Sequence, residues 1–416
     1  MQNIKIRIKE LIDNGKFPQL SYKLVDNDIQ ISGFRDAHCH VWGLGIKYLE
    51  PDFSNFKSLE QCLELIANSQ KNRGHWLTGR GWNQELWINP EFPSKEHLDS
   101  IFPDEPVALK RVDGHAYWVN SKALELAGIN KSTPNPVGGE ILKNKMNEPS
   151  GILIDNAMNL IDMVIPKYTK SQLEELIDKG ITEAKNVGLN AVFDMDVSPI
   201  QIGIFKRKAE NSELNIKIKS YISAQSDDYI GFYEKPFSIN NFELAGVKFY
   251  LDGALGSRGA ALLEPYSDDM QNKGLLLIDE QEFYSKVESA INRGFEIATH
   301  AIGDRANRML VDVYSMLRKK YPNAILKAEH SQIIHQDDIC KFAESRIIAS
   351  VQPIHCTSDA EMAIKRLGEN RCEKNAYLWK TLLENNIEII AGSDFPIESH
   401  NPILGIDAFI NRKSQA

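Results

Sequence analysis

The sequence predicts an α/β protein: a (β/α)8 barrel, the TIM-barrel fold, with a large insertion after its first strand. Eight short apolar runs end at Gly, Asp or His, as buried parallel strands do. Segments of helical period lie between most of these runs. The 416 residues are enough for one barrel of about 250 residues and a further domain-sized segment.

The eight predicted strands share β-branched or apolar residues and turn signals at their ends. They occupy residues 29–38, 188–196, 216–224, 244–253, 295–304, 324–332, 347–356 and 387–396. Helices are predicted at residues 171–186, 280–294, 305–321 and 375–386, several of which end at Gly or Asn. This alternation indicates a parallel sheet covered by helices.

The spacing between strand ends fits one barrel, which allows about 30 residues per unit. His330 follows His300 by 30 positions, and Asp394 follows His330 by 64, the length of two units. His300 follows Lys248 by 52 positions, one unit with a longer loop. The first interval differs, because 148 positions separate His40 from the start of the second strand.

The long first interval predicts an inserted subdomain over residues 51–166, between barrel segments 33–50 and 167–416. The insert carries most of the tryptophans and many turn residues. Because the C-terminal strand ends of a barrel carry its active site, an insert there can be a substrate lid or a specificity subdomain. A structural elaboration with its own small core is an equal alternative, and the two are not exclusive.

Composition and charge exclude several classes of function. Lys and Arg number 48 against 57 Asp and Glu, and no basic block is available for a phosphate backbone, so nucleic acid is not expected as a partner. No run approaches the ~20 apolar residues of a membrane helix, which favours a cytoplasmic protein with no membrane partner. The five cysteines have no CxxC spacing, so a metal would need imidazole and oxygen ligands.

Five histidines lie at or just beyond the ends of predicted strands: His38, His40, His300, His330 and His355. The C-terminal strand ends of a barrel meet at one face, so these side chains are expected to converge. His38 and His40 share strand parity and point to the same side. An HxH pair alone is a weak signal, but the whole set predicts a site.

Asp394 and Lys248 lie at the ends of the eighth and fourth predicted strands. The imidazoles and the carboxylate suit zinc or a similar divalent ion. A lysine that faces the barrel axis would be repelled by metals unless it loses its charge, and a neutral lysine can take up CO₂ to form a bridging carbamate. An ion pair of Lys248 with Asp252 or Asp394 is an equal alternative.

The motifs GFRDAHCH, VKFYLDGALGSR, THAIGDRA, AEHSQ, SVQPIHCTSD and AGSDFPIES together resemble the amidohydrolase superfamily, specifically its YtcJ-like branch, amidohydrolase family 3. WLTGRGWNQELW and RVDGHAYWVNSKALELAGI are similar to the insertion of that branch. The likeness covers residues 33–408, and each motif occurs in order at a matching strand end. It implies a barrel of the metal-dependent hydrolase type.

The resemblance also implies a set of metal ligands. By position these are His38 and His40 for the more buried metal, Lys248 as a carboxylated bridging lysine, His300 and His330 for the second metal, and Asp394. Two divalent ions, zinc first among them, would share a bridging hydroxide. The implied activity is hydrolysis of a non-peptide amide (C–N) bond in a small molecule, with Asp394 as general base and then general acid.

Three further residues are candidates for contacts with the substrate. His115 and His355 could hold the carbonyl oxygen or another polar group, and Trp82 could supply an apolar wall. A structural role is an equal alternative for His115, and core packing is the more usual role of a tryptophan. Arg258 and Asp304 lie just beyond ligand strands and are expected to brace loops or orient ligands.

The termini depart from the family pattern, in which flanking strands form a small β-sandwich. Residues 1–32 are expected to be a remnant of that sandwich, which is reduced or missing here. Only 22 residues follow Asp394, enough for one or two turns of the eighth helix. The barrel would then expose apolar surface, so either a second copy covers it in a homodimer or the polypeptide is a fragment.

Two alternatives to a two-metal hydrolase stay open. One is a mononuclear, deaminase-like amidohydrolase, against which Lys248 argues because a single metal needs no bridge. The other is a non-catalytic family member that acts as a binding protein, against which the six filled ligand positions argue. N-acyl amines, N-substituted formamides, N-acyl amino acids and cyclic amides all fit the chemistry, so the substrate stays open.

Overall fold

A computed structural model describes residues 22–25, 28–31, 33–54, 56–112, 114–136, 139–225 and 231–412. The chain forms two compact units. The first consists of two segments, up to Val41 and from Ile181 onward, and the second is the continuous segment Trp42–Gly180 between them in the sequence. The second unit contains the predicted insert, 51–166, and is longer at both ends. Its boundaries fall at helices α2 (Val41–Leu49) and α7 (Lys170–Asn186), which carry no turn signal at those points.

The first unit is built on a parallel sheet in which each predicted strand appears. In chain order these strands are β3 (Phe34–Cys39), β9 (Leu189–Val197), β10 (Lys217–Ser223), β12 (Phe242–Tyr250), β13 (Glu296–Ala301), β14 (Leu326–His330), β15 (Ile348–Val351) and β16 (Ile389–Ala391). They are neighbours in that order, and a short strand, β11 (Phe237–Ile239), pairs antiparallel with β12. The predicted (β/α)8 barrel is confirmed.

The barrel closes between its first and last strands, where backbone and side-chain hydrogen bonds join β3 to the segment after β16. The backbone N–H of Asp394 donates to the carbonyl oxygen of His38 at 2.7 Å, and that of His40 donates to the carbonyl of Phe395 at 2.8 Å. The Asp36 carboxylate accepts the Ser393 hydroxyl at 2.6 Å and the Ser393 backbone N–H at 3.1 Å. The same carboxylate accepts the backbone N–H of His38 at 3.0 Å.

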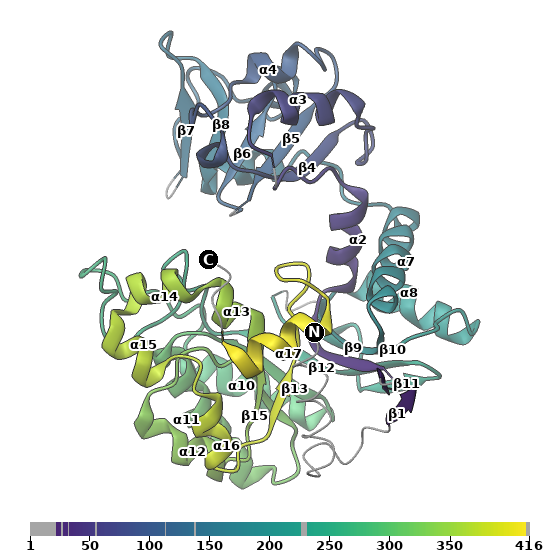
Figure 1. The fold of residues 1–416 in the computed structure, drawn as a ribbon, viewed down its shortest axis with the longest axis vertical. Helices are drawn as coiled ribbons and strands as arrows, with labels where there is room; N and C mark the ends of the chain where they lie inside the picture. The colour runs from purple at the N-terminus through teal and green to yellow at the C-terminus, as the bar shows by residue number, and fades with distance from the viewer. Residues whose placement is uncertain are drawn as a thin grey trace. The chain divides into compact units, whose positions relative to one another are not determined.

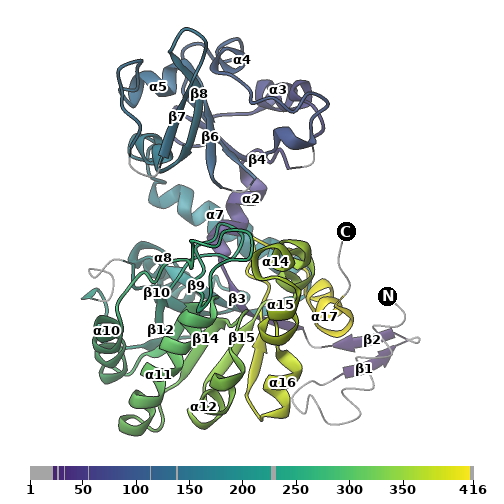
Figure 2. The same ribbon diagram turned by 90° about the vertical axis from the view of Figure 1, so that its left-hand side faces the viewer.

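Helices follow the strands and cover the outside of the sheet, as Figure 2 shows for α10, α11, α12 and α16. Their bounds are α8 (Pro199–Glu210), α10 (Glu280–Asn292), α11 (Asp304–Lys320), α12 (Ile339–Glu344), α13 (Pro353–Ser358), α14 (Ala360–Leu367), α15 (Glu369–Asn375) and α16 (Trp379–Glu384). A short 3₁₀ turn, Gln336–Asp338, precedes α12. The apolar side chains of α11, such as Leu310 and Val313, are fully buried.

The helix after β16 is longer than the sequence suggested. Helix α17 spans Pro402–Asn411, ten residues rather than one or two turns. Asn401 caps it by accepting the backbone N–H of Ile403, and Pro402 occupies its first turn, where a missing N–H has no cost. Phe409 stacks on Trp379 of α16 with ring centroids 4.8 Å apart.

Buried charged and polar groups cross the barrel interior. Lys327 of β14 lies 3.0 Å from the carboxylate of Glu296 on β13, and it hydrogen-bonds the hydroxyl of Tyr221 on β10. Tyr221 donates to Glu296 at 2.6 Å, and Lys219 also pairs with Glu296 at 2.6 Å. Each group has an opposite charge or a hydrogen bond, as buried polar groups require.

The insert has a sheet of its own, visible in Figure 1 as β4 to β8. The strand order is β4 (Leu77–Trp82), β5 (Val107–Arg111), β6 (Ala116–Val119), β8 (Pro149–Asp155) and β7 (Gly139–Lys143), with only the first pair parallel. Its helices are α3 (Leu59–Asn68), α4 (Lys95–Asp99), α5 (Ser121–Leu126) and α6 (Asn159–Asp162), with 3₁₀ turns at Gln84–Leu86 and Asn156–Met158. Two apolar clusters form its core, one around Trp76 and Val119 and one around Trp82 and Trp118.

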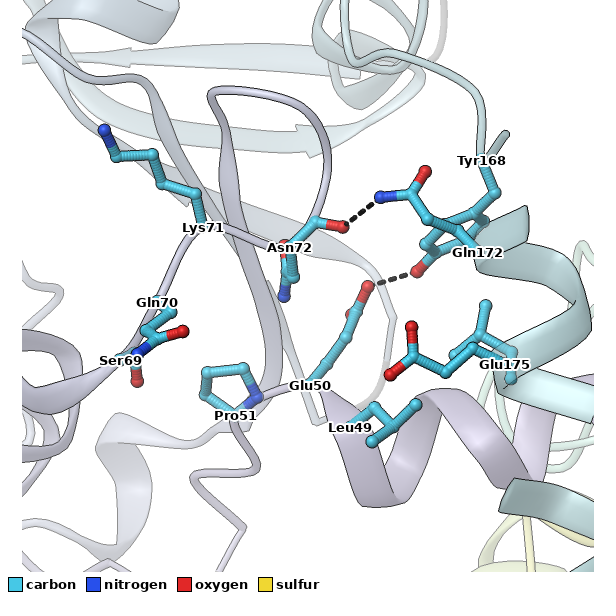
Figure 3. A pocket seen from close by; sticks show the side chains of 11 residues that line it. Leu49, Glu50, Pro51, Ser69, Gln70, Lys71, Asn72, Tyr168, Gln172 and Glu175 are labelled. Carbon is cyan, nitrogen blue, oxygen red and sulfur yellow. Dashed lines mark hydrogen bonds between the residues drawn. The ribbon is translucent and has the colours of Figure 1, made fainter. Parts of the chain in front are cut away.

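A polar pocket lies within the insert unit (Figure 3). It is lined by Leu49, Glu50, Pro51, Ser69, Gln70, Lys71, Asn72, Tyr168, Gln172, Glu175 and Leu176. The Tyr168 hydroxyl donates to Glu50, and the Gln172 amide donates to the Asn72 carbonyl at 3.0 Å. These bonds join the end of α2, the loop before β4 and the start of α7.

The described part of the N-terminal segment is an antiparallel hairpin of β1 (Tyr22–Val25) and β2 (Asp28–Ile31). The expected sandwich remnant, residues 1–32, lies otherwise outside the described residues. Among the described helices, none combines the length and apolar character needed to cross a bilayer.

Replacement of Gly392 by alanine should destabilise the barrel closure. A Cβ at Gly392 would meet the His38 backbone nitrogen at 2.3 Å and the Asp36 carboxylate at 2.7 Å. Overpacking of this kind costs about 1–3 kcal/mol of unfolding free energy, so the thermal unfolding midpoint of Gly392→Ala should fall. The matched control is Gly405→Ala in α17, where a Cβ meets nothing within 4 Å. An unchanged midpoint for Gly392→Ala would contradict the role given to this contact.

Candidate metal centre

Four of the predicted histidines converge at the C-terminal ends of the barrel strands. His38 lies in β3, His300 in β13, and His330 is the last residue of β14. Ring centroids are 4.8 Å apart for His38 and His330, and 4.5 Å apart for His300 and His330. His40 follows β3, with its ring 5.7 Å from that of His38. The structure therefore brings these four imidazoles together.

Asp394 lies among these imidazoles. Its Oδ1 is 3.2 Å from His40 Nε2 and 3.6 Å from His38 Nε2. One ligand atom each from His38, His330 and Asp394 lies within 4.8 Å of the others, close enough for one ion to touch all three. Both Asp394 (φ 61°) and His330 (φ 71°) adopt left-handed backbone conformations. Non-glycine residues rarely hold this conformation except where function or packing requires it.

The Nδ1 atoms of His38 and His40 each have a hydrogen-bond partner within the protein. His38 Nδ1 lies 2.6 Å from Oε2 of the buried Glu329, and His40 Nδ1 lies 3.1 Å from the Met195 carbonyl oxygen. A histidine ligand usually donates its second N–H to a carboxylate or carbonyl, which leaves the other nitrogen for the metal. In both residues that other nitrogen is Nε2, the atom nearest Asp394.

The chemistry of the donor atoms fits a metal. Within the described part of the chain, His300 Nε2 and His330 Nδ1 are buried without a hydrogen-bond partner. Buried imidazole nitrogens seldom lack a partner, and a metal ion satisfies a nitrogen lone pair. Nitrogen and carboxylate oxygen are the ligands that zinc and related divalent ions take.

Burial favours the neutral form of His300 and His330, the form that binds metal. Burial, assisted by the nearby Lys248, lowers the pKa of His300 to about 3, and burial lowers the pKa of His330 well below its ordinary value. Burial alone would raise the pKa of Asp394, but the neighbouring His38 and His40 outweigh it and hold this pKa below its ordinary value. Asp394 is therefore an ionised carboxylate.

Lys248 is buried on β12 and forms no carboxylate ion pair in the part of the chain that the structure describes. Burial lowers the pKa of Lys248, which favours the neutral amine. Asp252, one of the two ion-pair partners considered above, instead accepts backbone N–H groups of Ala261, Ile302 and Gly303 at 2.8–3.0 Å. The ion-pair alternative for Lys248 is not observed.

His355 also belongs to this group, although it lies in α13 rather than in a strand. Its Nε2 is 3.8 Å from Asp394 Oδ2, and its ring centroid is 6.1 Å from that of His330. Its Nδ1 is 3.3 Å from the amide nitrogen of Gln332. His355 is therefore positioned beside the carboxylate and outside the four-histidine cluster.

His115 and Trp82 belong to the insert unit, and their contacts with a substrate stay predictions. The Trp82 ring is fully buried in the insert core, and its Nε1 donates to the Leu109 carbonyl at 2.7 Å. The His115 side chain is 51% exposed and lies 2.8 Å from Asp155 Oδ1. Burial gives Trp82 a packing role, whereas the exposed imidazole of His115 can reach a ligand.

The two loop residues have the bracing contacts expected of them. The buried Asp304 accepts the backbone N–H of Leu263 at 2.8 Å. Arg258 pairs with Asp268 at 2.9 Å, and Arg366 of α14 contacts the same carboxylate. The bond to Asp304 fastens the long loop after β12 to the start of α11, and the contact of Arg366 fastens the same loop to α14.

Sequence reasoning missed Glu329 and Asp194. Glu329 is fully buried and holds His38, while Asp194 is fully buried and accepts the backbone N–H of Val41 at 2.9 Å. A charged residue inside an otherwise apolar strand is the signal that could have identified both, since such a residue needs a partner.

A (β/α)8 barrel with histidines and an aspartate at its strand ends defines a metal-dependent hydrolase. The chain belongs to the amidohydrolase family, whose model matches residues 29–416. The family implies a divalent metal, and the donor atoms described above fit one.

Several known proteins are similar to this chain over most of its length. YtcJ of Bacillus subtilis (strain 168) is 32% identical over 98% of this chain and 77% of its own. LONG AFTER FAR-RED 3 of Arabidopsis thaliana is 29% identical over 99% of this chain and 74% of its own. N-substituted formamide deformylase of Arthrobacter pascens is 23% identical over 89% of this chain and 71% of its own. The crystal structure of an uncharacterized metal-dependent hydrolase from Pyrococcus horikoshii OT3 superposes on this structure with a TM-score of 0.79. The two sequences are 27% identical, and the superposition covers 92% of this chain and 75% of the other.

Loss of the Glu329 carboxylate should weaken metal binding. In Glu329→Gln the side chain keeps its size but no longer offers a charged acceptor to His38 Nδ1, so the affinity for zinc should fall about 10- to 100-fold. The measurement is zinc retained against a competing chelator. Glu344→Gln, at an exposed position on α12, is the matched control. Equal zinc affinity in wild type and Glu329→Gln would refute this role.

Proposed function

We propose that this protein hydrolyses a non-peptide C–N bond, an amide of a small molecule, with two divalent metal ions, zinc as the first choice. The observation that carries the proposal is the convergence of six side chains, two of which, His300 and His330, have a buried nitrogen that lacks a hydrogen-bond partner among the described residues. The six are His38, His40, Lys248, His300, His330 and Asp394.

Two metal ions, when bound, would supply hydroxide near neutral pH and polarise the scissile carbonyl. His38 and His40 would hold one ion, and His300 and His330 the other. Lys248 would hold both as a carbamate: its neutral amine takes up CO₂, a C–N bond forms, and one proton leaves. Its burial without an anionic partner supports this proposal and favours two metals over a mononuclear, deaminase-like site.

Asp394 would act first as general base and then as general acid in the reaction. Its ionised carboxylate lies beside the Nε2 atoms of His38 and His40, so it can accept a proton from the attacking water. It would then donate that proton to the amine nitrogen as the C–N bond breaks, which leaves a carboxylic acid product and a free amine. The carbonyl oxygen would lie toward His355, on the other side of the Asp394 carboxylate.

The names of the relatives support cleavage of an amide C–N bond but do not identify the substrate. One of them is named for the removal of a formyl group from N-substituted formamides, a C–N cleavage of the proposed kind. At 23% identity, that name suggests a class of reaction on which this protein can be tested. The acyl and amine parts of its substrate stay open.

Metal content should depend on Lys248. Wild-type protein purified with bicarbonate and without chelator should hold two metal equivalents per chain, and Lys248→Ala should hold one or fewer because the bridge is lost. Elemental analysis of both proteins is the measurement. Lys380→Ala, at a position 89% exposed on α16, should hold two and serves as the control. A folded wild type that takes up neither zinc nor manganese would overturn the proposal and favour a non-catalytic binding protein.

Asp394 should be needed for turnover more than for substrate binding. In Asp394→Asn the amide cannot accept and return the proton, so kcat should fall by about 10²–10⁴ while KM changes little. The comparison uses a panel of N-formyl and N-acetyl amines, with metal content measured on the same samples. A variant with full metal content and unchanged kcat would remove Asp394 from the proton transfer.

A further inference from the structure

The two ring nitrogens of His355 have different surroundings. His355 is mostly buried, and its Nδ1 lies 3.3 Å from the side-chain amide nitrogen of Gln332. An amide nitrogen can only donate, so Nδ1 must be the accepting nitrogen of the neutral ring. The proton of the neutral imidazole is then on Nε2.

The Nε2–H group of His355 has no partner in the described chain. It is buried, and the nearest carboxylate oxygen, Asp394 Oδ2, lies 3.8 Å away, beyond hydrogen-bond range. A buried donor without an acceptor destabilises the folded state, so such groups are rare unless they serve a ligand. The donor points to an acceptor atom that a substrate would bring.

Gln332 is held through its backbone. Its side chain is buried, and its backbone carbonyl accepts the N–H of Tyr377 at 2.7 Å. The Tyr377 hydroxyl donates to the backbone carbonyl of His355 at 3.3 Å. Tyr377 therefore ties the segment after β14 to helix α13, and this places the backbone of Gln332 beside that of His355.

The reversed arrangement is electrostatically poor. If the Gln332 amide oxygen faced the ring, Nδ1 would carry the proton and Nε2 would be a bare lone pair. That lone pair would face the Asp394 carboxylate across 3.8 Å with no proton between them. The observed orientation instead places a positive N–H edge toward the anion.

We propose that Gln332 is a positioning residue that holds His355 in its Nε2–H form, so that this N–H binds the carbonyl oxygen of the amide substrate. The inference rests on the proposed amide hydrolysis and adds how the carbonyl is held. As the tetrahedral intermediate forms, that oxygen gains negative charge, and a fixed donor stabilises it more strongly than it stabilises the ground state.

The tautomer can be measured directly on the zinc-loaded protein. Two-bond ¹H–¹⁵N correlation spectra of protein labelled with ¹⁵N-histidine distinguish the two tautomers, and His355→Gln identifies the signals of His355 by their loss. We expect a protonated Nε2 in wild type. In Gln332→Glu a carboxylate faces Nδ1 and can only accept a hydrogen bond from it, so the proton should move from Nε2 to Nδ1 and the tautomer should reverse. A protonated Nδ1 in wild type would overturn the inference whether or not the protein hydrolyses amides.

The kinetic effect should follow the tautomer. Gln332→Glu removes the Nε2 donor and should lower kcat about 10²–10³-fold at full zinc content, the usual effect of losing one such donor. Gln332→Leu removes the amide without imposing the opposite tautomer, so its loss should be smaller. Gln336→Glu, four residues further along at an exposed position, makes the same change in charge and should keep wild-type kcat.

The outcomes separate this inference from the proposed function. Reversal of the tautomer in Gln332→Glu without any change in kcat would overturn the carbonyl contact while leaving amide hydrolysis intact. A zinc-loaded wild type with the expected tautomer but no amidase activity would defeat the proposed function and, with it, the carbonyl contact, while the role of Gln332 in fixing the ring would stand. If Gln332→Glu does not fold, the wild-type spectrum and Gln332→Leu still decide.

Discussion

The bridge between the first and last barrel strands is the constraint on which the metal centre depends. The Asp36 carboxylate joins His38 of β3 to Ser393 after β16, and backbone hydrogen bonds on either side continue the closure. Because His40 and Asp394 follow these contacts within a few residues, closure of the barrel and assembly of the donor set are one event. Burial then favours the neutral form of His38, His300 and His330, so the same packing that stabilises the fold also prepares these side chains to bind a metal.

Three of the candidate histidines have a neighbour that can orient the ring. Glu329 orients His38, the Met195 carbonyl orients His40, and Gln332 faces His355. One ring nitrogen is used for orientation in each residue, and the other is left for a metal or a substrate. The neighbours differ in kind: oxygen atoms contact the rings of His38 and His40, the proposed metal ligands, whereas an amide nitrogen faces His355.

Much of the fold was predictable because a parallel barrel leaves a strong local signal. Strands that are buried on both faces appear as apolar runs, and residues at their ends must share one face, which is how His38, His300 and Asp394 were recognised. The sequence could single out Glu329 as a buried charge, but it could not predict that Glu329 contacts His38 or that Gln332 contacts His355, because each contact joins residues distant in the sequence. The limits of the insert stay a prediction, and α17 proved longer than the short final segment suggested.

The insert unit contains its own sheet and two apolar clusters, so its folding does not draw on the barrel interior. Residues that decide its stability, such as Trp76 and Trp118, are separate from those that hold the donor set. Such a division lets the two parts accumulate substitutions independently. A lineage can alter the loops of the insert while it keeps one hydrolytic apparatus, and a protein engineer can diversify the same loops with the barrel sequence held constant.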